Sequence, residues 1–329
     1  MKSTNITLLV FLLACGPSFS QSTTGVIVGL VRDPNTALVP GAKVTARNAG
    51  TRAESHTTTD GEGYYRFSNL APGDYFVEVE ASGFRKSTIS PQNLGTSGSL
   101  RLDVTLEIGS VTEVVVVEAT ATAVNTEDAQ LGRSIRDQVG LPVLSGNGGR
   151  NVLSLAGIQP GVVFAGQLSG QQAGVFSANG QRAQANNYML DGADSNDLAI
   201  NVPDMVQGIS PNAVTEFRLV TGAMKAEFGR NSGAIVMVTP KSGTNNWHGG
   251  ASETFRNTKL NAVPFFQKSV TGGTTELFSS GLKRKPQWNS NDFDANFGGR
   301  VVRDKTFFYV SYLGFRRRQG VANSATVPS

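Results

Sequence analysis

The sequence predicts a mainly β chain in which a β-sandwich precedes a mixed α+β domain and the start of an incomplete transmembrane β-barrel. Two observations carry this prediction. Short apolar runs of strand length are separated by Gly, Pro, Asn and Asp turn signals, and 38 of the 329 residues are glycine. Further along, residues 292–301 alternate strictly between small or apolar residues and polar ones.

The first twenty residues are typical of a secretory signal peptide. Lys2 supplies a positive start, residues 6–14 form an apolar run, and residues 18–20 offer a small-x-small cleavage pattern before Gln21. The run is shorter than the roughly 20 residues that a membrane-spanning helix needs. A buried core helix is the alternative interpretation, but the N-terminal position favours export.

Cys15 is the only cysteine of the chain. Residues 12–15 also resemble a lipoprotein cleavage site, so lipidation is the alternative to cleavage after Ser20. Cleavage there leaves a mature chain without cysteine, which excludes disulfides, thiolate metal sites and cysteine nucleophiles. No later segment approaches 18 apolar residues, and we therefore expect any membrane crossing to use strands.

Charge and histidine content argue against two classes of function. The net charge is only +4, and the one basic run, residues 316–318, is typical of a solvated strand end. We therefore expect no nucleic-acid partner. A zinc peptidase needs His and carboxylate ligands in a fixed constellation, whereas His56 and His248 lie in separate segments without a Glu at ligand spacing. We expect no enzymatic activity, no metal and no cofactor.

Residues 21–108 are expected to form a small antiparallel β-sandwich, because about six or seven short strands follow one another without an intervening helix. Alternation assigns one face to Tyr75, Val77, Val79 and Ala81. The predicted strands are 26–31, 42–46, 51–59, 64–67, 75–81 and 100–106.

Four stretches of this region, 29–33, 39–44, 59–67 and 70–75, resemble the carboxypeptidase regulatory-like domain. The resemblance implies a sandwich attached to bacterial surface proteins and no peptidase. The fold is sometimes grouped with carbohydrate-binding modules, so a secreted or surface carbohydrate-binding or adhesion protein is the alternative function. Tyr64, Tyr65 and Tyr75 could stack on sugars, but they also suit a sandwich core.

Residues 109–125 are expected to be a linker that contains a partner-binding segment. This segment, residues 113–119, resembles the TonB box, although Val114 and Glu118 replace the usual Thr. An extended apolar segment of this kind can be captured by strand addition. The alternative is that the four valines form a last strand of the sandwich or an inter-domain strand. The candidate residues for binding TonB are Glu113, Val114, Val115, Val116, Val117, Glu118 and Ala119.

Residues 126–243 are expected to form the mixed α+β domain. A short helix is predicted after the Gly-rich turn that ends at Gly149, with Val152, Leu155 and Ala156 on one face. Downstream, stretches 227–234 and 239–245 resemble the plug domain of TonB-dependent receptors in the Oar-like branch, which joins a regulatory-like sandwich to the plug.

Residues 244–329 are expected to hold the first strands of an outer-membrane β-barrel. In residues 292–301 one face carries Phe293, Ala295 and Phe297, as a strand between lipid and water would. A soluble sheet packed on one face would show the same pattern. The remaining predictions are a first strand over 247–255, a long extracellular loop over 272–285, a short periplasmic turn at 302–305 and an aromatic strand over 306–315.

Three or four such strands of about 10 residues cannot close a barrel, so we expect the chain to be the N-terminal part of a longer receptor. The resemblance implies active uptake of an unidentified ligand across the bacterial outer membrane. Expected partners are TonB with its inner-membrane energising partners, outer-membrane lipid, and an extracellular ligand for which carbohydrate is one candidate. The sandwich and plug would lie on the periplasmic side or in the barrel lumen.

Overall fold

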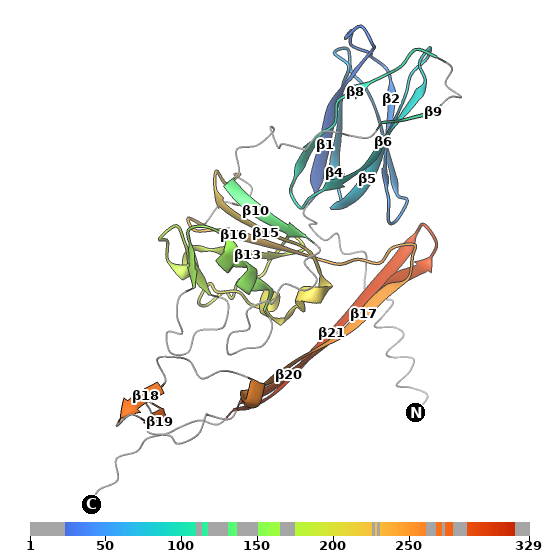
Figure 1. The fold of residues 1–329 in the computed structure, drawn as a ribbon. Coiled ribbons are helices and arrows are strands. Elements are labelled where there is room, and N and C mark those ends of the chain that lie inside the picture. The colour runs from blue at the N-terminus through green and yellow to red at the C-terminus, as the bar shows by residue number, and fades with distance from the viewer. Residues whose placement is uncertain are drawn as a thin grey trace, which may run out of the picture. The chain divides into compact units, whose positions relative to one another are not determined.

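The structure is a computed structural model that describes residues 24–109, 114–117, 131–136, 151–164, 175–225, 228, 231–260, 268–271, 274–278 and 288–319. The predicted signal peptide, Glu113, Glu118 and Ala119 lie outside these residues. The chain divides into two compact units, one that holds the N-terminal sandwich and one that holds most later strands (Figure 1). Among the described residues, no helix is long and apolar enough to span a membrane.

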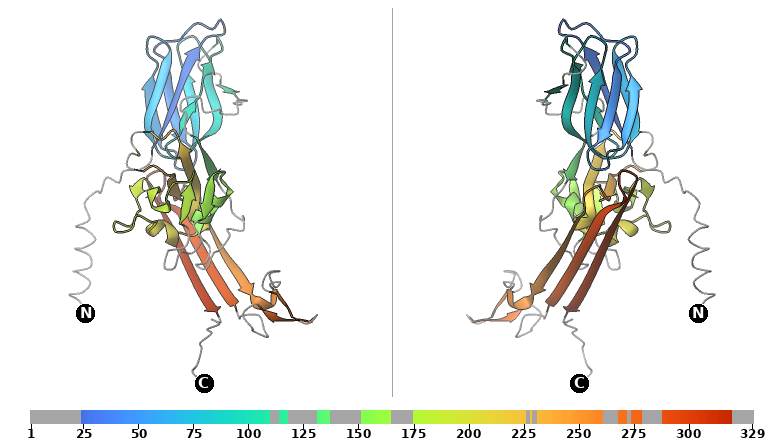
Figure 2. Two further views of the ribbon diagram at one scale, coloured as in Figure 1. Left: turned by 90° about the vertical axis from the view of Figure 1, so that its left-hand side faces the viewer. Right: turned by 90° about the vertical axis from the view of Figure 1, so that its right-hand side faces the viewer.

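Among the described residues, nine strands build the sandwich. They are β1 (Gly25–Arg32), β2 (Lys43–Asn48), β3 (Glu54–Thr58), β4 (Tyr64–Leu70), β5 (Gly73–Glu80), β6 (Lys86–Leu94), β7 (Ser99–Arg101), β8 (Val104–Thr105) and β9 (Val114–Val117). One sheet has the order β4-β1-β7, with β8 also paired to β1, and the other has the order β3-β2-β5-β6-β9. The two sheets, blue to teal in Figure 2, form the layers of a sandwich.

Two features of the sandwich differ from the sequence prediction. Strand β6 was missed because Pro91 and its polar neighbours interrupt the alternation; the register with β5 shifts there, as at a β-bulge. The expectation of a purely antiparallel sandwich is wrong, because β1 pairs in parallel with β7 and β8, and β6 pairs in parallel with β9.

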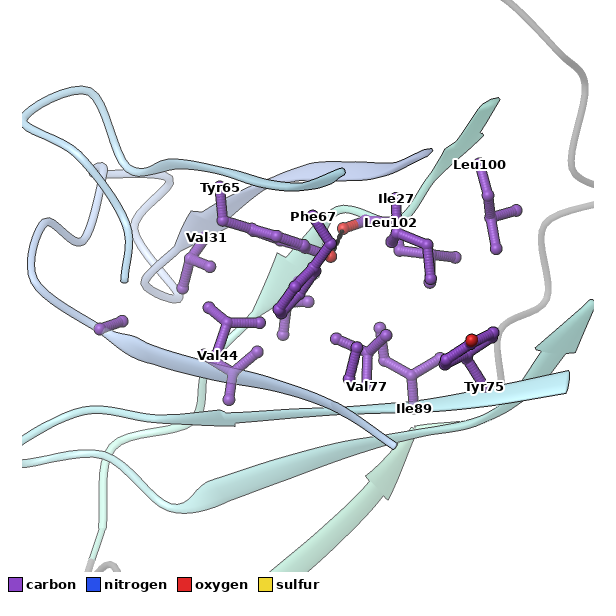
Figure 3. Packing of buried hydrophobic residues seen from close by; sticks show 14 of the residues in the cluster. Ile27, Val31, Val44, Tyr65, Phe67, Tyr75, Val77, Ile89, Leu100 and Leu102 are labelled. Carbon is purple, nitrogen blue, oxygen red and sulfur yellow. Dashed lines mark hydrogen bonds between the residues drawn. The ribbon is translucent and has the colours of Figure 1, made fainter. Parts of the chain in front are cut away.

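The inward faces of both sheets meet in one apolar core (Figure 3). The Tyr65 hydroxyl donates a hydrogen bond of 2.6 Å to the Leu102 carbonyl oxygen, and burial, with a smaller effect of Asp103, raises the Tyr65 pKa above its ordinary value. A Cβ on Gly29 would lie 1.9 Å from the same Leu102 oxygen, so only glycine fits at this crossing. Tyr65 and Tyr75 are both buried, which confirms the core interpretation of these two rings.

The central region of the chain, residues 131–240, holds a five-stranded sheet with the order β10-β15-β16-β13-β14, accompanied by the pair β11-β12. The strands are β10 (Leu131–Arg136), β11 (Val162–Phe164), β12 (Phe176–Ala178), β13 (Asn187–Leu190), β14 (Ala193–Asp194), β15 (Val214–Gly222) and β16 (Ile235–Pro240). Short 3-10 helices connect them, namely η1 (Val152–Ile158), η2 (Ala183–Ala185), η3 (Met205–Gly208) and η4 (Pro211–Ala213). Strand β16 begins directly after the stretch 227–234 and ends inside the stretch 239–245, the two stretches that resemble the plug domain.

The helix predicted after Gly149 is present as the 3-10 helix η1. The Asn151 side chain caps it by accepting a 2.9 Å hydrogen bond from the Leu153 amide. Its buried residues include Leu153 and Ala156, while Leu155, which the prediction placed on the buried face, is only half-buried. Three residues per turn align positions 153 and 156, whereas the prediction assumed the 3.6-residue period of an α-helix.

The last sheet of the second unit has the order β17-β20-β21, and all its pairings are antiparallel. It is built from β17 (His248–Asn257), β20 (Trp288–Val302) and β21 (Thr306–Gln319), with η6 (Thr258–Leu260) after β17 and the small hairpin of β18 (Lys268–Thr271) and β19 (Thr274–Phe278). β20 and β21 have 15 and 14 residues, more than the expected 10. The short turn predicted between them is confirmed, and Figure 2 shows these strands side by side in red.

Candidate functional site

Strand β9, which is the described part of the predicted partner-binding segment, lies at the edge of the five-stranded sandwich sheet. It runs parallel to β6, and the register pairs Lys86 with Val114 and Ile89 with Val117. The alternative prediction, a last strand of the sandwich, therefore describes where this backbone lies. Partner binding is still compatible with this position, because an edge strand keeps one side of its backbone available.

The chain that leads to β9 is hydrogen-bonded to the residues just before β6. The Arg85 amide donates a 2.8 Å hydrogen bond to the Glu107 carbonyl, and the Gly109 amide donates one of 3.2 Å to the Gly83 carbonyl. An ion pair of 3.3 Å between the Arg85 and Glu107 side chains adds to these contacts. The backbone is thus held as far as Gly109, shortly before the predicted segment begins.

Lys86 stands at the first register position of the β6–β9 ladder and belongs to a small ion cluster. Its Nζ lies 2.8 Å from a Glu78 carboxylate oxygen and 2.9 Å from one of Glu80. Hydrogen bonds to Glu78 and Glu80 raise the Lys86 pKa, and the bond from Lys86 lowers the Glu80 pKa. The two carboxylates lie on β5, so the charge of Lys86 is balanced within the sandwich.

Strand β20 has two chemically opposite faces. Asp292 and Asp294 are 3% and 4% exposed, whereas Phe293 and Phe297 are 36% and 50% exposed. The alternation predicted for residues 292–301 is therefore confirmed over residues 292–297, with the acidic residues covered and the aromatic residues uncovered, whereas Gly298 and Gly299 are both buried. This is the reverse of a strand that packs an apolar face onto a core.

The buried face of this sheet contacts the helix η4 of the predicted plug region. Ser210, the N-cap of η4, donates a hydrogen bond from its hydroxyl to the Asp294 carboxylate on β20. The Asn212 side-chain amide donates a 2.8 Å bond to the Ser252 hydroxyl on β17. These contacts satisfy polar groups that would otherwise be buried without partners. They place the polar start of η4 against the face of β17 and β20 that carries Ser252 and Asp294.

A second contact joins the end of the central region to the turn between β20 and β21. The Asn245 amide nitrogen donates a 2.8 Å bond to the Asp304 carboxylate, and the Asp304 backbone amide donates a 3.0 Å bond to the Asn245 side-chain oxygen. Arg300 donates a 2.9 Å bond to the Asn245 carbonyl. Asp304 has a left-handed φ of 62°, so this reciprocal pair holds a tight turn in place.

An aromatic cluster covers the exposed face of the sheet near this turn. The Trp247 ring stacks on Phe297 with centroids 5.5 Å apart, and Phe308 meets Trp247 edge-on at 5.8 Å. A Cβ on Gly299 would lie 2.5 Å from the Trp247 ring, so glycine lets the indole lie directly on the strand. Exposed aromatic rings at the end of a strand are typical of a membrane interface.

Sequence reasoning gave no role to Asn186, which is fully buried in the predicted plug region. Its amide nitrogen donates a 2.7 Å bond to the Phe176 carbonyl, and its side-chain oxygen accepts a 2.8 Å bond from the Ala234 amide. One side chain therefore ties β12 to the residue that precedes β16. Burial raises the pKa of the neighbouring Tyr188 to about 12.

Both histidines have ordinary local contacts. His56 Nδ1 lies 3.1 Å from the Thr45 hydroxyl oxygen, and the His248 ring stacks on Tyr309 with centroids 6.0 Å apart. Within the part of the chain that the structure describes, no three His, Cys, Asp or Glu side chains are grouped so that they could hold a metal ion.

Comparison with protein families finds a matching domain family for each of two parts of the chain. Residues 26–107 match the carboxypeptidase regulatory-like domain, and residues 239–329 match the outer membrane beta barrel domain. The chain is 28% identical over 328 residues to the TonB-dependent transporter Oar of Myxococcus xanthus, a match that covers 97% of this chain. It spans only 29% of that relative's own length. These findings confirm the predicted resemblance to the Oar-like receptors and the predicted fold class.

Solved structures resemble only part of the chain. Hydroxyquinol 1,2-dioxygenase from Pseudomonas putida is 10% identical with a TM-score of 0.23, and the match covers 28% of this chain and 58% of the enzyme. GBS52, a minor pilin of Streptococcus agalactiae, is 16% identical with a TM-score of 0.22 and coverages of 29% and 48%. At these TM-scores neither likeness supports a statement about activity.

Proposed function

We propose that this chain contributes the sandwich, the plug and the first barrel strands of a TonB-dependent transporter, which takes up an unidentified ligand across the bacterial outer membrane. The observation that carries the proposal is the two-faced strand β20. Its exposed face carries Phe293 and Phe297, while Asp294 on the other face is hydrogen-bonded to Ser210 of the central region. Lipid outside and a polar plug inside explain both faces of one strand.

TonB is the proposed partner of residues 113–119. A strand of TonB would pair with this segment and pull it, with energy supplied by the inner-membrane partners of TonB. Export through the signal peptide at residues 1–20 and residence in the outer membrane belong to the same proposal. It requires no catalysis and no cofactor.

The pull would reach the plug through β10, the first described strand after the segment. β10 is the edge strand of the five-stranded sheet, and among the described strands it pairs with β15 alone. Glu216 on β15 is buried and accepts hydrogen bonds from Ser134 and Arg136 on β10. Separating β10 would leave this buried carboxylate without these two partners, so the contact resists opening until force is applied.

Titration of the purified chain with the purified periplasmic domain of TonB tests the proposal. Val115→Pro or Val116→Pro removes a backbone N–H from the segment and is expected to weaken binding at least tenfold. Thr120→Pro, just beyond the candidate residues, is the matched control and should bind like the wild type. In cells, Val115→Pro should abolish uptake while the protein still inserts into the outer membrane.

Two results would contradict the proposal. One is a wild-type chain that does not bind the TonB domain, and the other is a Val115→Pro variant that binds as tightly as the wild type. Fractionation offers a separate check, because the protein expressed from its own gene should be recovered with outer-membrane markers.

A further inference from the structure

We infer that the sandwich presents Val114–Val117 to TonB as a preformed edge strand, so that the TonB strand adds to the outer side of β9 while the inner side stays paired with β6. The inference rests on the proposed function, since it concerns how the same segment meets the same partner. It gives the sandwich a role in binding TonB. Neither the family resemblances of the chain nor the packing of the sandwich core explains such a role.

The ladder geometry leaves β9 able to pair twice. Successive residues of a β-strand direct their N–H and C=O groups alternately to the two sides, so the pairing with β6 uses only one side of Val114–Val117. β9 is the last strand in the order β3-β2-β5-β6-β9. Among the described strands none pairs with its outer side, which presents a short row of backbone groups, the template that an added strand requires.

The occupant that fits this edge is an extended peptide strand rather than a small ligand. The edge offers main-chain donors and acceptors at the spacing of a β-ladder, and pairing with a strand satisfies all of them together. The four valines also have high strand propensity, which favours an extended segment with strands on both sides. Addition of the TonB strand would extend the sheet beyond β9.

The sandwich reduces the entropy that TonB binding has to overcome. A free peptide with the sequence of residues 113–119 must lose backbone freedom when it pairs, whereas β9 is already extended along β6. The hydrogen bonds at Arg85 and Gly109 also restrict the chain that leads into β9. The full chain should therefore bind the TonB periplasmic domain roughly tenfold more tightly than the peptide does.

A disulfide between β6 and β9 tests whether β9 must leave the sandwich. The register pairs Thr88 with Val116, and neighbouring strands lie about 4.8 Å apart, within the range that a disulfide spans. The variant is Thr88→Cys with Val116→Cys in a Cys15→Ser background. A matched control, Glu78→Cys with Thr88→Cys, joins β6 to β5 at another register pair and leaves β9 unlinked.

Binding of the purified TonB periplasmic domain is measured for both variants, oxidised and reduced. The inference predicts that the oxidised Thr88–Val116 variant binds within about twofold of its reduced form, as the control does. Loss of binding on oxidation that is restored by reduction would overturn it, because β9 would then have to be released. Equal affinity of the peptide and the full chain would also overturn it. Absence of binding by the wild-type chain would instead refute the proposed function itself.

Discussion

The sandwich strand β5 and the long strand β20 use the same two-residue period with opposite results. In β5 the apolar residues Val77 and Val79 are buried, and the acidic residues between and beside them are partly exposed. In β20 Asp294 is buried and Phe297 is exposed. A two-residue period therefore identifies the two faces of a strand, but the partner that covers a face decides which residues can lie there.

The partners differ in their chemistry. β5 packs against the apolar inner face of the opposite sheet, so its covered side must be apolar. The covered side of β20 meets the polar residue Ser210 instead, and a carboxylate can be buried there because a hydroxyl donates to it.

The largest effect is expected from Val77→Asp, which gives β5 the acidic pattern of β20. Val77 is 0% exposed and has no polar partner in the apolar core, so an unpaired charge there should cost roughly 4 kcal/mol or more and unfold the sandwich. Hydrogen exchange of β5 peptides should become fast while β20 peptides stay protected. Thr58→Asp, on the exposed side of β3, is the control that should leave both unchanged.

A smaller and local effect is expected from Asn245→Ala. The change removes both partly buried hydrogen bonds between the Asn245 side chain and Asp304, at a cost of roughly 1–3 kcal/mol. Exchange should accelerate in the turn between β20 and β21, measured by hydrogen exchange of peptides that contain Asp304. Asn246→Ala, at the exposed neighbouring position, should not change that rate; if both variants behave alike, the pair does not hold the turn.

Ser87→Ala should stabilise the sandwich. Ser87 is 3% exposed, and its hydroxyl is among the buried polar atoms without a hydrogen-bond partner within the described structure. Removing an unsatisfied buried hydroxyl should raise the free energy of unfolding by about 1 kcal/mol. The urea midpoint of β6 protection measures this gain, and a lower midpoint would show that the hydroxyl is satisfied.

The smallest effect concerns pH and the ion cluster on the sandwich. Because the Glu80 pKa is lowered from 4.5 by its bond to Lys86, ionised Glu80 stabilises the folded sandwich above pH 4.5, and this contribution is lost as the pH falls through the lowered value. The raised Lys86 pKa stabilises the folded state below 10.5, and this contribution is lost as the pH rises through the raised value.

Both side chains are partly exposed, so solvent limits the effect to a few tenths of a kcal/mol. Urea unfolding of the sandwich at pH 7 and pH 3 measures it. Lys86→Met should reduce the difference between the two pH values, and an unchanged difference would assign it to other carboxylates.

Local sequence patterns were sufficient to assign the buried face of a strand where that face packs on an apolar core. Alternation identified the buried residues Val44, Val77 and Leu102, because an apolar core accepts any strand with one apolar side. The same rule found the two faces of β20. Turn signals likewise predicted the junction between β20 and β21.

The contacts that sequence reasoning missed depend on residues far apart in the chain. Neither the parallel pairing of β9 with β6 nor the pairs Asn186–Ala234 and Asn245–Asp304 leaves a periodic trace. Strand β6 was missed for a local reason, since a proline at a bulge resembles a break between strands. The 3-10 form of η1 depends on how its short segment packs, which the α-helical period does not report.

In the proposed transporter, the exposed face of β20 lies in lipid while the other face meets the plug. Spin labels at Phe293→Cys, Ala295→Cys and Phe297→Cys report the first face, and one at Asn296→Cys reports the second. In outer membranes, the first three labels should be accessible to dissolved oxygen and protected from a water-soluble nickel complex, whereas the fourth should show little access to oxygen. If the nickel complex reaches the first three labels freely, β20 belongs to a water-soluble sheet and the transporter proposal is contradicted.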